Sequence, residues 1–196
     1  MNRSAHEAVF LRGRRVYLRP PHKETDLVFF QRWINDPEVR RFLKTRGPYT
    51  MIAEERYFDR IGENGDHNLT ICLTDGTPIG YTGLHRFNHY DRTAVTGTWI
   101  AKPYWNRGYG TEAKLLLLHY AFDTLNLRKV CSSAIAFNAR SVGHNRNAGY
   151  RIEGRRKKQF FRSGRYHDEA LLACFREWWQ VKWEKYRRDR SAKRCY

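Results

Sequence analysis

The chain has 196 residues, 41% of them hydrophobic and 15% aromatic, which excludes intrinsic disorder and allows one domain with a buried core. Lys and Arg outnumber Asp and Glu by 37 to 20, and the resulting charge of +17 favours either a polyanionic partner or plain solubility. The apolar runs are too short for a membrane span, the N-terminus has no secretion signal and the four cysteines form no Cys-x-x-Cys pair, so we expect a cytoplasmic protein with reduced thiols and no metal site.

Hydrophobic periodicity and turn residues predict a chain in which strands and helices are mixed. Residues 1–12 show no clear period and are expected to form a loose arm. The last segment, 181–196, is expected to be a basic tail outside the domain. In chain order, the predicted elements are a strand at 14–19, helices at 23–33 and 50–61, strands at 67–73, 78–87 and 93–101, a helix ending near 124, a strand at 130–135, a helix at 138–147 and a hairpin of 150–161 with 165–175.

Two helix starts carry recognisable capping residues. Asp36 precedes Pro37, and this pair is typical of an N-cap followed by the first turn of a helix. Thr50 is the expected cap of the next helix, with Glu54 as its reciprocal partner.

The segment Tyr104–Ala113 joins a predicted strand to a predicted helix and contains Gly108 and Gly110. Glycine lets an anion approach the unpaired N–H groups at a helix start, where the helix dipole is positive, so a phosphate or pyrophosphate is the expected ligand. The chain has no Gly-Lys-Ser/Thr triplet, which excludes a Walker loop. The third glycine of a dinucleotide fingerprint is replaced by Ala113.

The residues around the two glycines indicate which class of phosphate-binding loop this segment resembles. The stretch resembles the coenzyme A loop of the GCN5-related N-acetyltransferases (GNAT), Gln/Arg-x-x-Gly-x-Gly/Ala, with Gly108 and Gly110 at the two small positions. Trp105 stands where Gln or Arg is usual, and Trp followed by Gly-Tyr-Gly-Thr-Glu-Ala is similar to the Rim-type branch that contains ribosomal-protein acetyltransferases. Asn106 replaces a glycine common in that branch.

Two later segments also resemble this family. Residues 137–150 are similar to its Asn-x-x-Ser/Ala segment that ends in Gly-Phe, and residues 164–168 are similar to its late Gly-x-Tyr-x-Asp hairpin. With the loop, the resemblance covers residues 14–178 and implies a single GNAT domain over 1–180. It implies an α/β fold of the acyl-CoA N-acyltransferase type, a mixed, mostly antiparallel sheet flanked by helices and splayed at the cofactor site.

The resemblance implies acetyl-CoA as co-substrate. Its phosphates are expected on the loop and its pantetheine arm along the preceding strand, and Asn138 is expected to bond that arm, although its position also suits a helix N-cap. The implied cofactor-binding residues are Trp99, Ile100, Ala101, Asn106, Arg107, Gly108, Tyr109, Gly110, Thr111, Asn138, Ser141 and Asn145.

The catalytic groups are less clear from the sequence. The strand glutamate of many relatives falls at Val95 and their tyrosine falls at Asn145, so both usual groups are absent. His85 is a candidate base acting through water, although a structural histidine is the favoured interpretation. Ser141 is a candidate proton donor near the thiol, or a small residue that packs its helix against the cofactor.

The predicted function is transfer of an acetyl group from acetyl-CoA to a primary amine. Because a strong base is missing, an amine that is already partly neutral, such as a protein α-amine, is the expected acceptor. The alternatives are an enzyme for a small-molecule amine (an aminoglycoside, an amino sugar or a polyamine) and a non-catalytic acetyl-CoA-binding or RNA- or ribosome-associated module. A polyamine is disfavoured by the charge of +17, which also leaves nucleic acid or the ribosome as a candidate partner, and the resemblance allows a homodimer.

Overall fold

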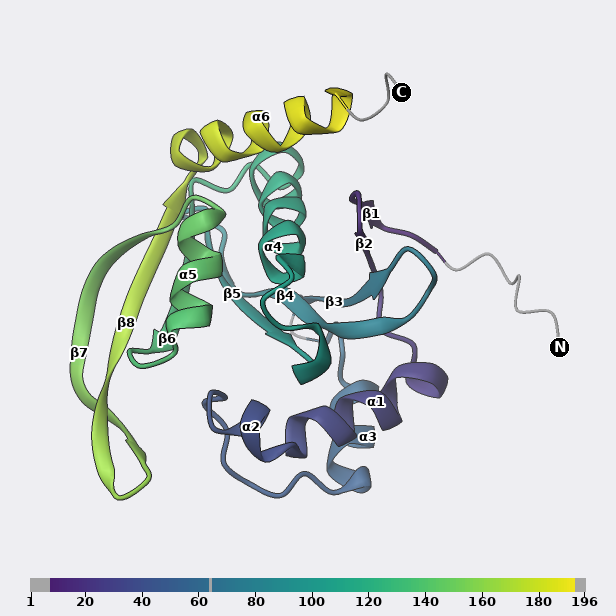
Figure 1. The fold of residues 1–196 in the computed structure, drawn as a ribbon, viewed down its shortest axis with the longest axis vertical. Helices are drawn as coiled ribbons and strands as arrows, with labels where there is room; N and C mark the ends of the chain where they lie inside the picture. The colour runs from purple at the N-terminus through teal and green to yellow at the C-terminus, as the bar shows by residue number, and fades with distance from the viewer. Residues whose placement is uncertain (1–7, 64, 193–196) are drawn as a thin grey trace, which may run out of the picture.

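The computed structural model describes residues 8–63 and 65–192 and is built around one sheet with the strand order β1-β2-β3-β4-β5-β6-β8-β7 (Figure 1). All neighbouring strands are antiparallel except β5 and β6, which are parallel. The expected mixed, mostly antiparallel sheet is confirmed. The strands are β1 Leu11–Arg12, β2 Val16–Arg19, β3 His67–Leu73, β4 Pro78–Asn88, β5 Thr93–Ile100, β6 Lys129–Ile135, β7 Arg151–Arg162 and β8 Arg165–Phe175.

Two helices, α2 and α3, begin at the caps that the sequence predicted. Asp36 accepts hydrogen bonds from the backbone N–H groups of Glu38 and Val39, and the Thr50 hydroxyl accepts one from Ala53. The helices are α1 Lys23–Asn35, α2 Pro37–Arg40, α3 Met51–Asp59, the 3-10 turn η1 Lys102–Tyr104, α4 Tyr109–His119, the π-helical turn η2 Tyr120–Thr124, α5 Ala139–Asn147 and α6 Arg176–Ala192.

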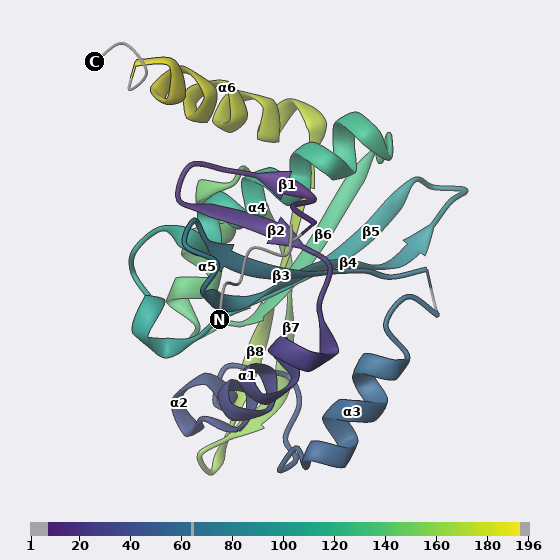
Figure 2. The same cartoon turned by 90° about the vertical axis from the view of Figure 1, so that its right-hand side faces the viewer.

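Successive strand residues point to opposite faces, so each face of the sheet has its own packing layer. On one face, Leu84 of β4 and Ala94 of β5 join Leu117 of α4 in the main apolar core. On the other face, Tyr81 of β4 packs with Phe30 of α1 in a smaller aromatic cluster. In both cartoon views α6 lies at one end of the molecule and α1–α3 lie at the other (Figures 1 and 2).

The sheet separates between β5 and β6. The two strands pair only from Thr93 to Val95 of β5, opposite Lys129 to Cys131 of β6. Beyond these residues β5 stays with β4, whereas β6 stays with β8 up to Ile135. The resulting gap leaves backbone groups of β5 without a strand partner, and it is the splayed point that the resemblance implied.

Three sequence expectations need correction. Residues 11–12 of the expected loose arm form β1, which pairs with β2, while residues 1–7 lie outside the described residues. Residues 181–192 are not a separate tail, because they continue α6, whose Trp179 is 2% exposed in the core. Within the described residues Glu54 returns no hydrogen bond to Thr50; it is buried, and burial raises the pKa of its carboxyl.

Candidate active site

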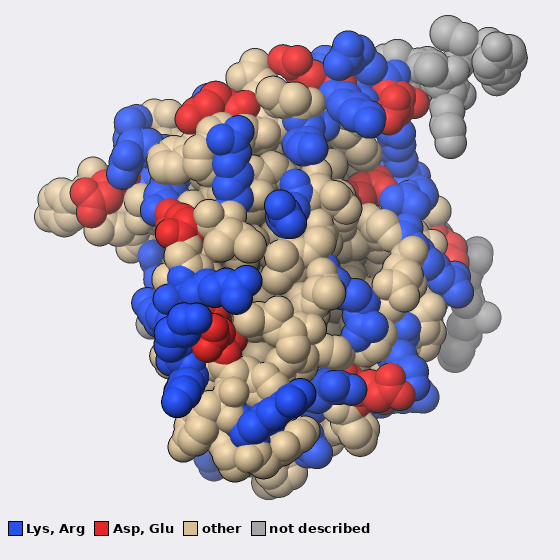
Figure 3. All heavy atoms as spheres, turned by 60° about the vertical axis from the view of Figure 1, so that its left-hand side comes forward, with Lys and Arg blue, Asp and Glu red and all other residues tan. Residues whose placement is uncertain are grey.

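A cavity of about 740 Å³ lies where β5 and β6 separate. Its walls come from β4 and β5, the glycine loop, α5 and the segment after α2 (Figure 3 shows the hollowed face). The lining residues are Val39, Phe42, Leu43, Lys44, Tyr81, His85, Arg86, Val95, Thr96, Gly97, Thr98, Trp99, Ile100, Tyr104, Trp105, Asn106, Gly108, Tyr109, Gly110, Thr111, Ser133, Ala134, Ile135, Asn138, Arg140, Ser141, Gly143, His144 and Asn147.

The glycine loop ends in an uncapped helix start. Gly108 is the N-cap of α4 with φ +79°, a left-handed conformation that suits glycine, and no side chain caps the helix. The backbone N–H groups of Tyr109, Gly110 and Thr111 therefore have no side-chain acceptor at the edge of the cavity. Asn106 also has a positive φ, +60°, so the loop reverses direction without the glycine usual there.

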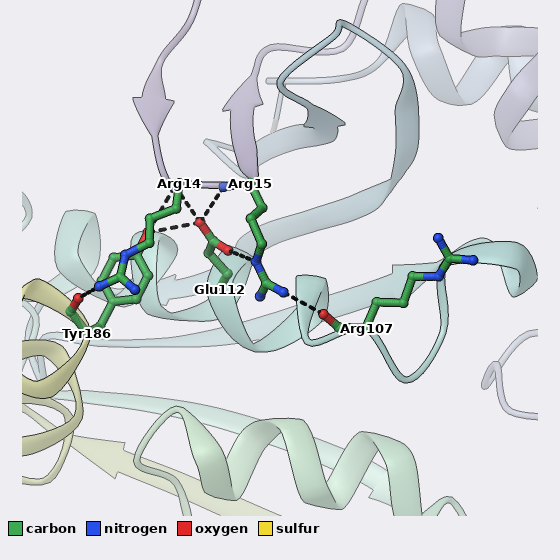
Figure 4. Close-up of polar contacts among 5 residues, drawn as sticks. All are labelled: Arg14, Arg15, Arg107, Glu112 and Tyr186. Carbon is green, nitrogen blue, oxygen red and sulfur yellow. Dashed lines mark hydrogen bonds and ion pairs between the residues drawn. The ribbon is translucent and has the colours of Figure 1, made fainter. Parts of the chain in front are cut away.

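A buried carboxylate holds the base of this loop in place (Figure 4). Glu112, in the first turn of α4, is 3% exposed. It accepts hydrogen bonds from the backbone N–H groups of Arg14 (2.5 Å) and Arg15 (3.0 Å), from Arg15 Nε (3.0 Å) and from the Tyr186 hydroxyl (2.9 Å). We call this set the Glu112 clamp. It joins the β1–β2 turn, α4 and α6, which are far apart in the sequence.

Arg15 extends the Glu112 clamp into the loop itself. Its Nη1 donates to the carbonyl oxygen of Arg107 at 2.8 Å, and its guanidinium lies 5.3 Å from the centre of the Tyr109 ring. A Cβ added at Gly108 would approach Arg15 Nη2 to 3.0 Å. The loop is thus fixed from behind by a cation and remains open toward the cavity.

Trp105 closes the other side of the loop. Its indole N–H donates to the carbonyl oxygen of Ile100 at 2.6 Å, across the end of β5. The Arg140 guanidinium of α5 stacks on the indole, 3.7 Å from its centre. The residue that departs from the usual Gln or Arg therefore ties the loop to both β5 and α5.

Helix α5 contributes the side chains that the 137–150 segment predicted. Asn138 is its N-cap, and Asn138 Oδ1 accepts from the backbone N–H of Ser141 at 3.1 Å. Asn138 also lines the cavity. His144 packs on the loop, with its ring 3.8 Å from a Cβ built at Gly110. Burial, helped by the charge of Lys114, lowers the pKa of His144 to about 3, so this imidazole is neutral near pH 7.

Most of the predicted cofactor residues line the cavity, but three do not. Ala101 is fully buried and its N–H donates to Ile79 O. Arg107 presents its carbonyl oxygen to Arg15 instead of facing the cavity. Asn145 is 1% exposed and donates to the carbonyl oxygen of Ser141 at 2.8 Å inside α5.

His85 lies at the splayed end of the site, on β4 directly opposite Val95. Asp66 Oδ2 lies 3.1 Å from His85 Nδ1, and the Tyr81 hydroxyl lies 2.9 Å from Nε2. The pairing register shifts immediately after His85, where Arg86 has a positive φ of +52°. Such a bulge re-aims side chains, and His85 stands beside Val95, the position at which many relatives carry a glutamate.

Sequence reasoning missed Lys114, a lysine on the core side of α4. It is 1% exposed, and its Nζ donates to Thr96 Oγ1 at 2.8 Å. Burial lowers the pKa of Lys114 to about 7. The available signal was its spacing, because Lys114 lies three and four residues before the core residues Leu117 and Leu118 and so shares their helix face.

A family model described as an acetyltransferase (GNAT) domain matches residues 15–151. The chain belongs to the GNAT acetyltransferase family. It is 28% identical over 162 residues to the spermidine N(1)-acetyltransferase of Escherichia coli K12, covering 82% of this chain and 86% of that protein. It is 31% identical over 108 residues to a Bacillus subtilis protein named "Putative ribosomal N-acetyltransferase YdaF", covering 55% of this chain and 59% of that protein.

Solved GNAT structures share the fold. The spermidine N-acetyltransferase from Vibrio cholerae in complex with CoA and spermine has a TM-score of 0.77 and 24% sequence identity, covering 85% of this chain and 98% of that chain. None of the described helices of this acetyltransferase is long and apolar enough to cross a membrane. Nor do the described residues hold a group of three His, Cys, Asp or Glu suited to a metal ion.

GNAT enzymes use acetyl-CoA, and the loop fits its phosphates in three respects. The N–H groups at the start of α4 are uncapped, Gly108 leaves room for close approach, and the helix dipole favours an anion there. Bound acetyl-CoA would supply the acetyl thioester. The residues that would hold it are Tyr109, Gly110 and Thr111 at the phosphates and Asn138 at the arm.

Substitution Gly108→Val should weaken acetyl-CoA binding at least tenfold, because a branched side chain disfavours the left-handed backbone and would contact Arg15. Calorimetry on the folded variant measures this. Gly164→Val is the matched control, since Gly164 also has a positive φ but lies in the β7–β8 turn with open space around it. Equal affinity in the Gly108 variant would show that the phosphates bind elsewhere.

Substitution Asn138→Asp separates the two roles of this residue. Aspartate keeps the oxygen that caps α5 but loses the amide donor, so acetyl-CoA affinity should fall by about 1–3 kcal/mol while the melting temperature changes little. Calorimetry and thermal unfolding measure the two effects. If Asn138→Asp binds acetyl-CoA normally and only Asn138→Ala lowers stability, Asn138 is a helix cap alone.

Proposed function

We propose that this GNAT enzyme acetylates the α-amine of a protein or peptide and that polyamines are poor acceptors. The observation that carries the proposal is the charge of the cavity. Among its described lining residues are Arg86 and Arg140, which form no ion pair within the described residues, and Lys44, which is paired outside the lining; the lining has no Asp or Glu. Cations in a low-dielectric cleft repel a polycation such as spermidine, although spermidine acetyltransferases are among the relatives.

Two carboxylates that adjoin the cavity lining are already paired with cations. Glu169 is 2% exposed and bonds Lys44 Nζ at 2.7 Å and Arg156 at 3.2 Å. Glu38 is paired with Lys102. These acids therefore neutralise the protein's own cations and are not available to bind a cationic acceptor.

An α-amine also fits the modest base of the site. With a pKa of about 7.7–8.0, roughly a tenth to a sixth of α-amines are neutral at pH 7, compared with about one lysine amine in a few thousand. In the structure, Asp66 accepts from His85 Nδ1, and this leaves Nε2 to take a proton. We assign His85, which lines the cavity, as the base; the Tyr81 hydroxyl lies 2.9 Å from its Nε2 and itself donates to Asn68 Oδ1.

Ser141 lines the same cavity from α5. Its backbone is held within the helix, because its N–H donates to Asn138 Oδ1 and its carbonyl oxygen accepts from Asn145 Nδ2. We therefore assign its hydroxyl to orienting the thioester end of acetyl-CoA.

An acceptor screen with the purified enzyme tests the proposal by following release of the coenzyme A thiol. Peptides with a free α-amine should give kcat/KM values at least tenfold above those of spermidine and of N-blocked peptides that contain lysine, because more of the α-amine is neutral. A screen in which spermidine is the best acceptor would overturn the assignment.

His85→Gln should lower kcat/KM for the best acceptor by about 10²-fold, as for loss of a general base. On its acid side the pH profile should then follow only the neutral fraction of the acceptor. His89→Gln, an exposed change on the following turn, is the matched control. Equal rates in the His85 and His89 variants would show that His85 is structural.

The exposed β7–β8 hairpin is strongly basic and adjoins the cavity mouth. Residues 151–166 contain seven Lys or Arg and one Glu, and blue side chains gather along this edge in Figure 3. Arg162 Nη2 donates to the carbonyl oxygen of Leu43, which lines the cavity, so hairpin and mouth are joined. Phe161 and Tyr166 stay 43% and 64% exposed.

Cations with exposed aromatic rings suit single-stranded nucleic acid, because bases stack on rings while cations track phosphates. We infer that the hairpin contacts RNA near the acceptor amine, as on a ribonucleoprotein. The +17 charge gives the wider surface the same preference.

Changing Arg155, Lys158 and Arg165 together to Gln should weaken binding of a single-stranded RNA. The slope of log K against log salt concentration should become shallower by about 0.7 for each phosphate that is no longer neutralised. These three make no ion pair within the described residues. The same triple change at Lys182, Lys185 and Arg187 of α6 is the control of equal charge. Filter binding at several salt concentrations measures both, and equally weakened binding in the two variants would mean that only net charge matters.

A further inference from the structure

Lys114 is a buried amine that the proposed mechanism does not use. Its ammonium makes no ion pair within the described residues, and its contacts are Thr96 Oγ1 at 2.8 Å and the face of the Tyr150 ring at 5.5 Å. A buried amine without a counterion is costly. The other titratable groups that face it are His144 of α5, Cys174 of β8 and the Tyr150 hydroxyl.

Thr96 connects this amine to the cavity. It is the first residue of β5 beyond the last pair with β6, Val95 opposite Cys131, and it lines the cavity at the splayed point. Because neighbouring strand residues face opposite sides, Thr96 points toward α4 while Val95 shares its face with His85. His85 and the Lys114–Thr96 pair therefore approach one point on β5 from the two faces of the sheet.

We propose that Lys114 is a positioning residue that supplies, through the Thr96 hydroxyl, the proton taken up by the departing coenzyme A thiolate. This inference rests on the proposed acetyl transfer, and it places the acetyl thioester in the cavity where β5 and β6 separate. It gives the enzyme separate groups for removing and for supplying a proton.

The proton balance closes within this arrangement. The acceptor nitrogen forms the new N–C bond and loses one proton toward His85, and the C–S bond breaks with its electron pair on sulfur. The sulfur takes the hydroxyl proton of Thr96, which takes one from the Lys114 ammonium and leaves a neutral amine. In each cycle His85 gains one proton and Lys114 loses one. Turnover therefore consumes no protons overall.

The surroundings single out Lys114 among these groups. Burial lowers its pKa to about 7, whereas burial and the charge of Lys114 lower the pKa of His144 to about 3. Burial raises the pKa of Cys174 to about 12 and that of Tyr150 well above its usual value. Among these four side chains, only Lys114 has a pKa near neutral pH. The proposal needs its protonated form, which is present below that pKa.

The test uses Lys114→Met, Thr96→Val and Thr96→Ser, with Thr82→Val as the matched control. Met replaces the unpaired amine by an apolar chain of similar length, which buried sites tolerate well. Thr82 is also a buried threonine whose hydroxyl bonds within the sheet, to Gly97 O and Thr98, but it does not line the cavity.

The first readout is the ultraviolet absorption of the thiolate in bound coenzyme A across pH, which does not depend on turnover. In Lys114→Met and Thr96→Val the thiolate should appear at higher pH than in the wild-type enzyme, because its cationic partner or the connecting hydroxyl is missing. Thr96→Ser and Thr82→Val should match the wild type. If all variants bind coenzyme A normally and the thiolate titrates at the same pH in each, the proposal is overturned. Loss of coenzyme A binding in Gly108→Val tests the cofactor site and does not bear on Lys114.

The second readout is the pH dependence of kcat. In the wild type kcat should fall as pH rises through the pKa of Lys114, and this alkaline limb should be absent from Lys114→Met and retained in Ser141→Ala. We expect kcat to drop about tenfold to a hundredfold in Lys114→Met and Thr96→Val. A retained limb in Lys114→Met would overturn the proposal, and so would a Thr96→Ser variant as slow as Thr96→Val.

Discussion

The rest of this site depends on one carboxylate buried at the start of a helix. A charge with so little exposure is tolerated only when hydrogen bonds replace water, and Glu112 receives four of them. The bonds come from the turn before β2 and from Tyr186 on α6, so satisfying one side chain fixes the position of three segments. The β1–β2 turn also needs a glycine next to this carboxylate, since a Cβ at Gly13 would lie 2.6 Å from Glu112 Oε1.

The Glu112 clamp sets where the N-terminal end of α4 meets the sheet. The two faces of the sheet then carry different polar groups. Because α4 is held against one face, Lys114 reaches Thr96 from that side. The opposite face carries His85 and its partner Asp66. The two sets of groups meet at the part of β5 that β6 leaves uncovered, and strand alternation keeps them apart elsewhere.

Structural features that depend only on neighbouring residues were predictable from the sequence. Asp36 and Pro37 start α2 as expected, and Gly108 ends its loop at the start of α4, because caps and left-handed turns depend on local conformation. The order of elements followed from hydrophobic periodicity and turn residues, and the splayed sheet followed from the resemblance carried by three motifs. Asn138 was assigned two roles, and the structure shows the helix cap directly.

What the sequence could not provide are contacts between distant segments. The bond between Tyr186 and Glu112 joins residues 74 positions apart, and so the last segment looked like a tail. The side-chain direction of His85 depends on Asp66 and on a bulge in β4, neither of which has a periodic signal. Lys114 was overlooked because an isolated lysine in an apolar run is usually expected to reach solvent.

The reach of the Glu112 clamp has a consequence for synthesis of the chain. A polypeptide leaves the ribosome from its N-terminus, and domains form as their segments emerge. The strands, the glycine loop and α4 are all made before Tyr186 of α6, one of the final residues of the clamp, exists. Until then Glu112 lacks one of its donors and Trp179 has not covered the core. The support that fixes the loop is therefore incomplete until α6 has been made, and a nascent chain arrested before α6 would carry the glycine loop without it.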